Sequence, residues 1–189
     1  MDFADYDKII LGIDPGTNIM GYGLIGIKNK KYYMIAMGEI KLDKFPNHAV
    51  KLKHIFDKVT GLIDNYKPDE MSLEAPFYGK NVQSMLKLGR AQGVAIAAGL
   101  QREMPIFEYS PKKIKQSITG KGTATKEQVA SMLQMLLKFK EMPKNLDATD
   151  GLAAALCHFF QHSPRGFGEK TATNSWESYA AANKNKIKG

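Results

Sequence analysis

The chain has 189 residues, of which 43% are hydrophobic and 24% charged, and its formal net charge is +8. This composition is typical of one globular domain, and its basic balance favours a polyanionic partner, with nucleic acid as the default. No apolar run reaches the ~20 residues of a membrane-spanning helix, and the acidic start of the chain lacks the features of a signal peptide. A single cysteine, Cys157, excludes an intrachain disulfide. We therefore expect a cytoplasmic protein that does not associate with membranes.

The N-terminal part of the chain predicts three strands in a meander. Residues 9–13 are apolar and mostly β-branched, which indicates a strand buried on both faces. Asp14 stands where this run ends, and the Pro-Gly dipeptide after it favours a tight turn. Apolar runs over residues 21–27 and 32–40 predict two further strands in antiparallel pairing. One carboxylate therefore stands at the mouth of a rigid central strand.

The middle of the chain alternates between helical and strand patterns. Apolar residues recur at the 3.6-residue period over residues 52–66, which predicts an amphipathic helix. Met71 to Glu74 then form a short strand that again ends on a carboxylate. A helix over residues 82–103 is rich in glycine and alanine, which indicates close packing against the sheet or against a second copy of the chain. Residues 105–109 predict a fifth strand.

The C-terminal part predicts three helices and a tail. The starts of the first two helices are marked by Ser-Pro at residues 110–111 and by a capping box over residues 125–128, and the last helix covers residues 147–160. Together the elements give an α/β fold, with a five-stranded mixed sheet and helices on both faces. We expect the folded domain to span residues 1–162, and residues 163–189 to be a polar, basic and mobile tail.

Four acidic residues stand at the ends of these predicted elements. Asp14 and Glu74 each end a buried strand, so they lie at one edge of the sheet if the two strands are parallel neighbours. Asp147 and Asp150 are three residues apart and share a helix face. Each aspartate also has an ordinary explanation: Asp14 as a turn former, Asp147 as a helix N-cap, and Asp150 as an acid favoured by the helix dipole.

A cluster of these carboxylates would need a cation. Neighbouring acids repel one another, and their pKa values rise unless positive charge compensates. Mg²⁺ binds carboxylate oxygens, and paired ions ~3.5–4 Å apart activate a water and stabilise the leaving oxygen in phosphodiester hydrolysis. An acidic cluster in a basic chain therefore predicts a nuclease that uses two Mg²⁺ ions per active site, for which we expect Mn²⁺ to substitute.

Basic residues follow the acidic ones in two stretches. From Ser110 to Lys126 there are five lysines and no acid, and further cations come soon after Glu74. A charge run is often only a solvated face, but glycines around Lys121 let backbone amides approach phosphates, which favours DNA contact. The candidate DNA-binding cations are Lys80, Lys87, Arg90, Lys112, Lys113, Lys115, Lys121 and Lys126.

Five separate blocks carry a resemblance to a known family. They are LGIDPGTNIMGYG, the stretch from Glu74 to Asn81, SMLKLGRAQGVAIAA, FEYSPKKIKQSITGKGTATKEQV and LDATDGLAAALCH. Together they resemble RuvC, the bacterial Holliday junction resolvases, over roughly residues 8–162. The resemblance implies a ribonuclease-H-like fold, a homodimer, and Mg²⁺-dependent resolution of four-way DNA junctions by paired symmetric nicks in recombination and repair. It also implies the RuvA–RuvB branch-migration complex as a partner.

The resemblance also assigns roles to individual residues. The catalytic, metal-binding acids of the family match Asp14, Glu74 and Asp147, with Asp150 as the fourth member of the cluster. The aromatic residue that opens the junction matches Phe77, and the lysines of the catalytic loop match Lys115 and Lys126. The chain departs from the family at Pro76, at Gly151 and in its tail, but no expected ligand is missing.

Three other functions compete with this one. The turn after Asp14 is similar to the phosphate loop of actin- and Hsp70-like ATPases, but those proteins need two such domains, which 189 residues cannot supply. The acids disfavour a catalytically idle junction-binding protein, and the matches at Phe77 and the lysine loop disfavour a nuclease for RNA ends. Finally, His158 and His162 have a spacing that can bind a metal, but we expect a surface pair at a helix end.

Overall fold

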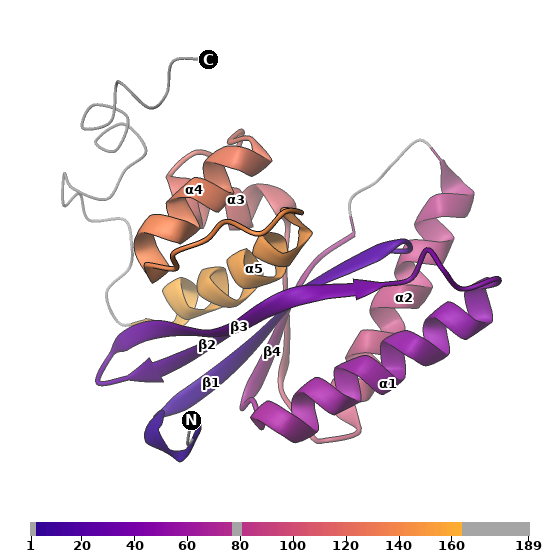
Figure 1. The fold of residues 1–189 in the computed structure, drawn as a ribbon, viewed down its shortest axis with the longest axis horizontal. Helices are drawn as coiled ribbons and strands as arrows, with labels where there is room; N and C mark the ends of the chain where they lie inside the picture. Colours follow the sequence, from indigo (N-terminus) through magenta and orange to yellow (C-terminus); the bar gives the residue numbers. More distant parts are fainter. Residues whose placement is uncertain (1–2, 77–80, 164–189) are drawn as a thin grey trace.

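The computed structural model describes residues 3–76 and 81–163, which form a mixed sheet with helices on both faces (Figure 1). The sheet has five strands in the order β3-β2-β1-β4-β5. The strands are β1 (Lys8–Asp14), β2 (Ile19–Lys28), β3 (Lys31–Lys41), β4 (Glu70–Glu74) and β5 (Ile106–Tyr109). The helices are η1 (Phe3–Asp5), α1 (His48–Tyr66), α2 (Val82–Leu100), α3 (Pro111–Thr119), α4 (Lys126–Leu137) and α5 (Asp147–His162). This arrangement confirms the α/β fold expected from the sequence.

The register of the central strands decides where the acidic residues meet. β1 pairs antiparallel with β2 and parallel with β4, and β2 pairs antiparallel with β3, so the predicted meander is confirmed. Ile13 of β1 is the partner of Leu73 of β4, and both are fully buried. The next residue on each strand is an acid, Asp14 and Glu74. The two strand-end acids therefore stand side by side at one edge of the sheet.

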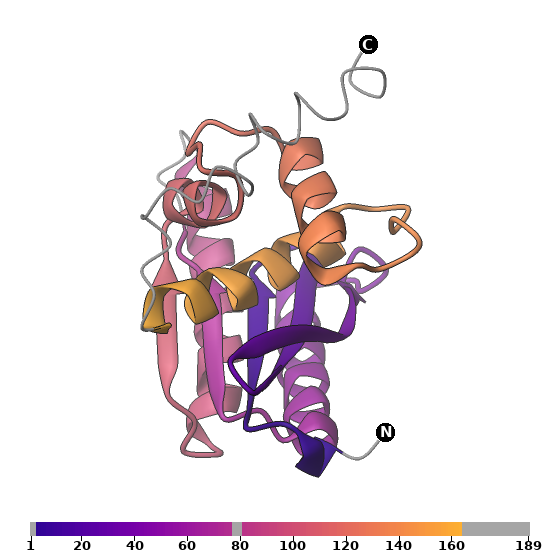
Figure 2. The same cartoon turned by 90° about the vertical axis from the view of Figure 1, so that its left-hand side faces the viewer.

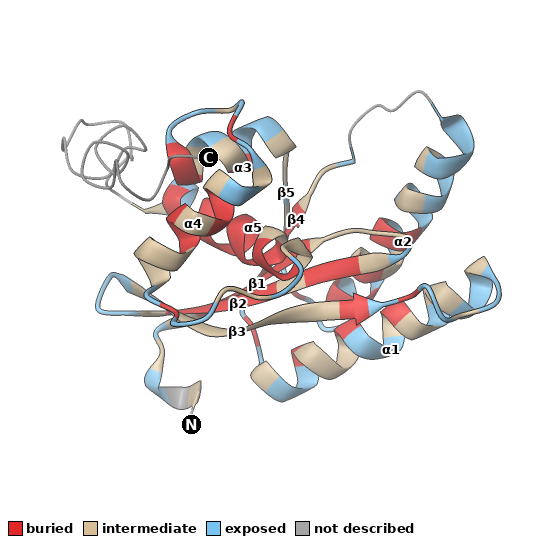
Figure 3. Cartoon of the chain, turned by 45° about the horizontal axis from the view of Figure 1, so that its top comes forward, coloured by how far each residue is buried: buried red, intermediate tan, exposed pale blue. Residues whose placement is uncertain are grey.

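The two faces of the sheet are covered by different sets of helices. α1 and α2 pack on one face, while α5 lies across the strands on the other face, as Figure 2 shows, with α3 and α4 outside it. Because it lies between the sheet and these two helices, α5 is buried almost throughout (Figure 3). Such a helix must be apolar all round, as the sequence LAAALC within it is.

Glycines let the backbone of α5 rest directly on the sheet. A Cβ atom at Gly12 would lie 2.0 Å from the carbonyl oxygen of Gly151, and one at Gly21 would lie 1.9 Å from that of Asp147. On the helix side, a Cβ atom at Gly151 would lie 2.5 Å from the Cα atom of Tyr22. Gly151, one of the departures from the family pattern, is therefore needed for this contact. The contact brings the first turn of α5 against the ends of the central strands.

The small residues of α2 do not all have the same neighbours. A Cβ atom at Gly99 would meet side chains of the sheet, those of Met71 and Ile106, so one of the two expected packing modes is confirmed there. At Gly89 and Gly93 an added Cβ atom would meet nothing within 4 Å among the residues that the structure describes. These two glycines leave a smooth strip on the outer surface of α2.

The helix ends follow local signals, with two differences from the prediction. Thr125 and Gln128 form the predicted capping box of α4. α2 ends at Leu100 rather than near residue 103, because Glu103 adopts a left-handed conformation with a φ of 56°. The N-cap of α5 is Leu146, so the interpretation of Asp147 as a capping residue is wrong and its carboxylate is available for another role. Within the described ranges, no helix combines the length and apolar character needed to cross a membrane.

Candidate metal centre and active site

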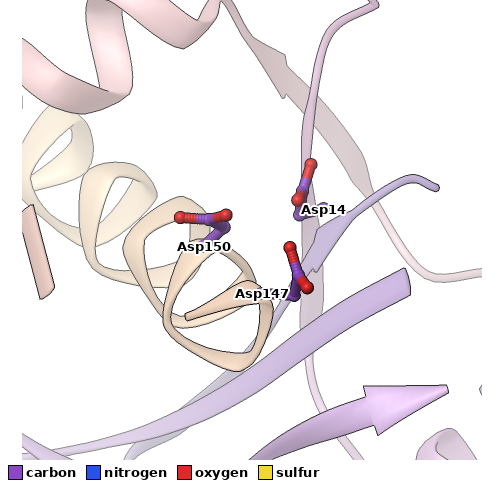
Figure 4. A group of neighbouring side chains, drawn as sticks. All are labelled: Asp14, Asp147 and Asp150. Atoms are coloured by element: carbon purple, nitrogen blue, oxygen red, sulfur yellow. The ribbon is translucent and has the colours of Figure 1, made fainter. Parts of the chain in front are cut away.

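Three carboxylates converge where β1 ends and α5 begins. Asp14, Asp147 and Asp150 each offer an oxygen atom, and these atoms all lie within 4.8 Å of one another. Figure 4 shows the side chain from β1 and the two from the first turn of α5 around a common space. The prediction that Asp147 and Asp150 share a helix face is confirmed, and that face is turned toward the end of β1.

Glu74 belongs to the same electrostatic system, although it lies outside this tight group of three. The register of β4 places it beside Asp14, and its negative charge is one of the causes that raise the pKa of Asp14. In turn, the charge of Asp150 helps to raise the pKa of Glu74. All four predicted acids are therefore coupled, as expected from strands that end at the same sheet edge.

Burial and mutual repulsion make this cluster resist ionisation. Burial, together with the charges of Glu74 and Asp150, raises the pKa of Asp14 from 3.8 to about 8. Burial, followed by the charge of Asp150, raises the pKa of Glu74 to about 7, and burial also raises that of Asp150. The negative charge of the ionised cluster therefore exceeds the positive charge around it, which is the condition under which a carboxylate group binds a cation.

Lys126 partly supplies this charge. Its Nζ lies 2.7 Å from Oδ1 of Asp147 and 2.6 Å from Oδ2 of Asp150. Partial burial alone would lower the Lys126 pKa, but these two hydrogen-bonded contacts outweigh it and the pKa is raised. Lys126 is the first residue of α4, so the capping box at Thr125 positions it. The amine therefore stays charged and holds two of the acids together.

The other candidate cations lie at different distances from the acids. The charge of Lys115 on α3 lowers the pKa values of Glu74 and Asp150, so Lys115 is also near the cluster. Lys112 packs its aliphatic stem against Gly122, and Lys113 and Lys121 are exposed. Lys87 and Arg90 are exposed on α2. Phe77, Lys80 and the tail from residue 164 lie outside the described residues.

The predicted surface histidine pair is wrong for His158. His162 is exposed, but the side chain of His158 is completely buried. Nδ1 of His158 lies 2.6 Å from the hydroxyl of Tyr109, and Nε2 lies 2.8 Å from Oε2 of Glu70. The other oxygen of Glu70, Oε1, lies 2.6 Å from Nζ of Lys8. The apolar sequence on both sides of His158 is the signal that could have revealed its burial, because it indicates a helix covered on all faces.

Sequence reasoning also missed Lys51. This residue of α1 donates from Nζ to the carbonyl oxygen of Thr17 at 3.0 Å and to Oδ1 of Asn18 at 3.2 Å. Thr17 and Asn18 belong to the loop that connects Asp14 with β2. Lys51 therefore ties α1 to the segment that follows the central acid of the site.

The fold and the cluster define a class of protein. A ribonuclease-H-like sheet, with acids at the ends of two adjacent central strands and on the helix that crosses them, is the framework of a metal-dependent nuclease. The donors are all carboxylate oxygens, which suit a hard divalent cation, and burial with mutual repulsion raises the pKa values of Asp14 and Glu74.

Comparison with known proteins identifies the family. The family model described as crossover junction endodeoxyribonuclease RuvC matches residues 10–158. Similar proteins of that name come from Christiangramia forsetii, 60% identical over 96% of this chain and 94% of the relative, and from Porphyromonas gingivalis, 55% identical over 96% and 98%. The chain belongs to the RuvC family of crossover junction endodeoxyribonucleases, and it is a nuclease.

Solved structures agree with this assignment. The structure of Thermus thermophilus RuvC in complex with a Holliday junction substrate has a TM-score of 0.76 and 28% identity, covering 82% of this chain and 94% of that chain. The fowlpox virus Holliday junction resolvase shares the fold, with a TM-score of 0.55 and 12% identity over 81% and 99% of the two chains.

Proposed function

We propose that the four acids and Lys126 form the catalytic centre with which this endonuclease nicks four-way DNA junctions, in homologous recombination and DNA repair. The observation that carries the proposal is the convergence of Asp14, Asp147 and Asp150 within 4.8 Å, with pKa values raised for two of them. Among the described residues, Lys126 alone forms ion pairs with these acids. Repulsion between such acids destabilises the fold, and metal ions that bind between them for hydrolysis would relieve this repulsion.

The acids are suited to hold two Mg²⁺ ions, for which Mn²⁺ would substitute. Asp14, Glu74, Asp147 and Asp150 would be the ligands, and the bound ions would activate water and neutralise the leaving oxygen. Asp14 and Glu74 would lose their protons as the cations bind, because an adjacent positive charge stabilises the ionised form. Lys126 holds Asp147 and Asp150 together before that step and keeps a positive charge where a phosphate would approach.

Paired symmetric nicks require two active sites related by a twofold axis, so we propose a homodimer. The exposed face of α2 supports it, because Val82, Leu86 and Leu100 are 66%, 51% and 58% exposed. Gly89 and Gly93 leave room on that helix for the close approach of another backbone. A second copy would cover these apolar groups.

The substrate contacts complete the proposal. Phe77 would stack on bases at the junction crossover. The candidate DNA-binding cations would bind backbone phosphates of the strand that reaches the acids. These cations are Lys80, Lys87, Arg90, Lys112, Lys113, Lys115, Lys121 and Lys126. We propose that residues 1–162 carry this activity in the cytoplasm, that the tail is dispensable for it, and that the RuvA–RuvB complex is its partner.

A mobile synthetic four-way junction tests the function. In Mg²⁺ the wild-type chain should cut it in symmetric pairs and leave a linear duplex of equal length intact. Asp14→Asn should abolish cutting while junction binding stays within about twofold, because binding uses phosphates and chemistry uses the cluster. Binding without cutting by the wild type would instead support the catalytically idle protein. Loss of binding by Asp14→Asn in parallel with cutting would show that Asp14 is structural.

A further inference from the structure

A second group of basic side chains lies beside the loop that follows Asp14, apart from the lysines of α3 and α4. Its centre is Lys51, which is tied to Thr17 and Asn18 of that loop. An ammonium group has three donors, and these two bonds use two of them. Lys51 therefore keeps one N–H donor for a further acceptor, beside the loop that follows Asp14.

His48, one turn earlier on α1, brings two cations of α2 into the same group. Burial lowers the pKa of the His48 imidazole, and the positive charges of Arg90, Lys87 and Lys51 lower it further. All the charged groups that act on His48 in this way are cations. His48 and Lys51 share one face of α1, Lys87 and Arg90 are likewise three residues apart on α2, and the two helices pack against each other. We name these four basic side chains the α1–α2 basic cluster.

Two features of the described residues leave this cluster open to an anion. Nε2 of His48 is buried and has no hydrogen-bond partner among the described residues. Lys87 and Arg90 are exposed, and like charges held near one another repel unless an anion lies between them. The guanidinium fork of Arg90 suits an oxyanion with two acceptors, such as a phosphate.

The position of the cluster indicates which anion it binds. Figure 1 shows that α1 and α2 begin at the same end of the molecule where β1 ends, and Lys51 joins that end to the active-site loop. A DNA strand that reaches the acids from this side passes over the cluster. Lys115 and Lys126 approach the acids from the other face of the sheet, on α3 and α4. The two sets of cations therefore flank the acidic site.

We propose that His48, Lys51, Lys87 and Arg90 form a second phosphate-binding site, which holds a backbone phosphate of the junction outside the position of cleavage. The proposal rests on the proposed function, and it adds His48 and Lys51 to the DNA-binding surface. It assigns the α1–α2 basic cluster to DNA affinity rather than to the cleavage chemistry. Within the described residues, none of the four site acids forms a hydrogen bond or an ion pair with this basic cluster. Its phosphate lies on the α1–α2 side of the acids.

The test compares two charge-neutralising variants of the full-length chain. One is the double substitution Lys87→Gln and Arg90→Gln, and the control is Lys58→Gln, an exposed lysine seven residues after Lys51 on α1, ~10 Å along the helix. Binding of a labelled four-way junction is measured in Ca²⁺ over a range of salt concentrations. We expect the double variant to bind roughly tenfold more weakly, with a salt slope smaller by about 1–2, and the control to match the wild type.

A second readout follows His48 directly. The imidazole signals of ¹³C-labelled histidine are titrated with and without the junction in Ca²⁺, and a His48→Gln variant assigns the signal. A bound phosphate should move the His48 titration to higher pH, because it neutralises the cations that now oppose protonation. The same titration with poly-glutamate tests an acidic protein segment as the occupant. A shift with poly-glutamate but not with the junction would overturn the proposal.

The outcomes separate this inference from the proposed cutting activity. Cutting of the junction by the wild type tests the function alone. If the wild type cuts but the double variant keeps its affinity and salt slope, the second phosphate site does not exist. A double variant that binds normally but cuts slowly at saturating enzyme would also overturn it, because the cluster would then act on the chemistry. A melting temperature close to that of the wild type confirms that the variant is folded.

Discussion

The pKa values of two glutamates shift in opposite directions at the two ends of the interface between α5 and β4. At one end, Glu74 joins a cluster in which burial raises its pKa to about 7. At the other end, burial opposes the ionisation of Glu70, but hydrogen bonds from Lys8 and His158 outweigh it and lower its pKa. Glu70 and Glu74 stand at the two ends of one short strand, on the same face. Both residues are glutamates on the same face of one strand, so the difference between their pKa values comes from their partners.

The end with Glu70 is complete without a ligand. Lys8, Glu70, His158 and Tyr109 form one chain of contacts between 2.6 and 2.8 Å that joins β1, β4, β5 and α5. The end with Glu74 has three further acids and one closely bound lysine. We infer that the first end stabilises the position of α5, while the second end uses that fixed position to hold carboxylates together. On this inference, folding energy from the network around Glu70 offsets the repulsion among the acids around Glu74.

The sharpest test of this comparison makes the same substitution at both ends. Glu74→Gln should reduce cutting on the order of 10²–10³-fold or more, the usual result of removing a preorganised charged group, and should stabilise the metal-free protein. Glu70→Gln should do the reverse, lowering stability by ~1–3 kcal/mol while cutting persists. Thermal melting without metal and single-turnover cleavage measure both. Equal effects of the two variants would contradict the division of roles.

The next largest effect concerns Lys126, which bridges Asp147 and Asp150. Lys126→Gln removes a charge that competes with metal for Asp147 and Asp150, so the Mg²⁺ concentration for half-maximal activity should fall. The maximal rate should nevertheless drop ~10–100-fold, because the acids lose the contact that orients them. Mg²⁺ titrations of cleavage separate these effects, with Lys138→Gln on the exposed end of α4 as the matched control. A higher Mg²⁺ requirement would show that Lys126 supports metal binding instead.

Stability should depend on pH in opposite directions at the two ends. Asp14 and Glu74 have raised pKa values in the folded state, so their contribution is present below pH 4 and is lost as pH rises to about 8 for Asp14 and about 7 for Glu74. Glu70 and His158 have lowered pKa values, so theirs is lost as pH falls below their ordinary values of 4.5 and 6.5.

Melting temperatures of the metal-free protein between about pH 2.5 and pH 9 check this prediction. The loss on the alkaline side should reach a few kcal/mol, since one pKa unit corresponds to ~1.4 kcal/mol. Mg²⁺ should reduce that loss, and so should Asp14→Asn, while neither should change the acidic side. If Mg²⁺ shifts both sides equally, it stabilises the fold generally rather than the acidic cluster.

The cluster around Glu74 could be predicted from the sequence better than the hydrogen-bonded network around Glu70. Acids at the ends of two buried strands meet whenever those strands are parallel neighbours, and a three-residue spacing places Asp147 and Asp150 on one helix face. The burial of His158 was missed because a histidine pair near a helix end is usually exposed, and only the position of α5 between two layers reverses this. The contact of Lys51 with Thr17 spans 34 residues, so no local pattern reports it.

Other assignments still depend on the family resemblance. Lys126 was matched to the catalytic loop through that resemblance, and its contacts with two acids now give the match a physical reason. Phe77 and Lys80 stay predictions, as does the tail, because they lie outside the described residues. The sequence alone does not identify α5 as the element whose backbone approaches the sheet at Gly12 and Gly21, because that contact joins segments far apart in the chain.

The smallest effect is expected from Tyr109→Phe, which removes one hydroxyl from the satisfied end. Glu70 is ionised, so Nε2 of His158 must donate to it, and in the neutral imidazole Nδ1 is then the acceptor. The Tyr109 hydroxyl therefore donates to Nδ1, consistent with burial raising the pKa of Tyr109 to about 12. Phenylalanine keeps the ring but leaves Nδ1 without its donor, which should cost ~1–2 kcal/mol of stability.

Thermal melting and ¹⁵N spectra of His158 measure this change. The melting temperature should fall by a few degrees, the Nε2–H tautomer should persist because Glu70 still accepts from it, and cleavage of the junction should stay within about twofold. Tyr33→Phe is the matched control, since Tyr33 is 45% exposed and should tolerate the same loss without effect. A strong fall in cleavage at unchanged stability would break the comparison, because the hydroxyl of Tyr109 would then act on the catalytic acids through α5 rather than hold the helix in place.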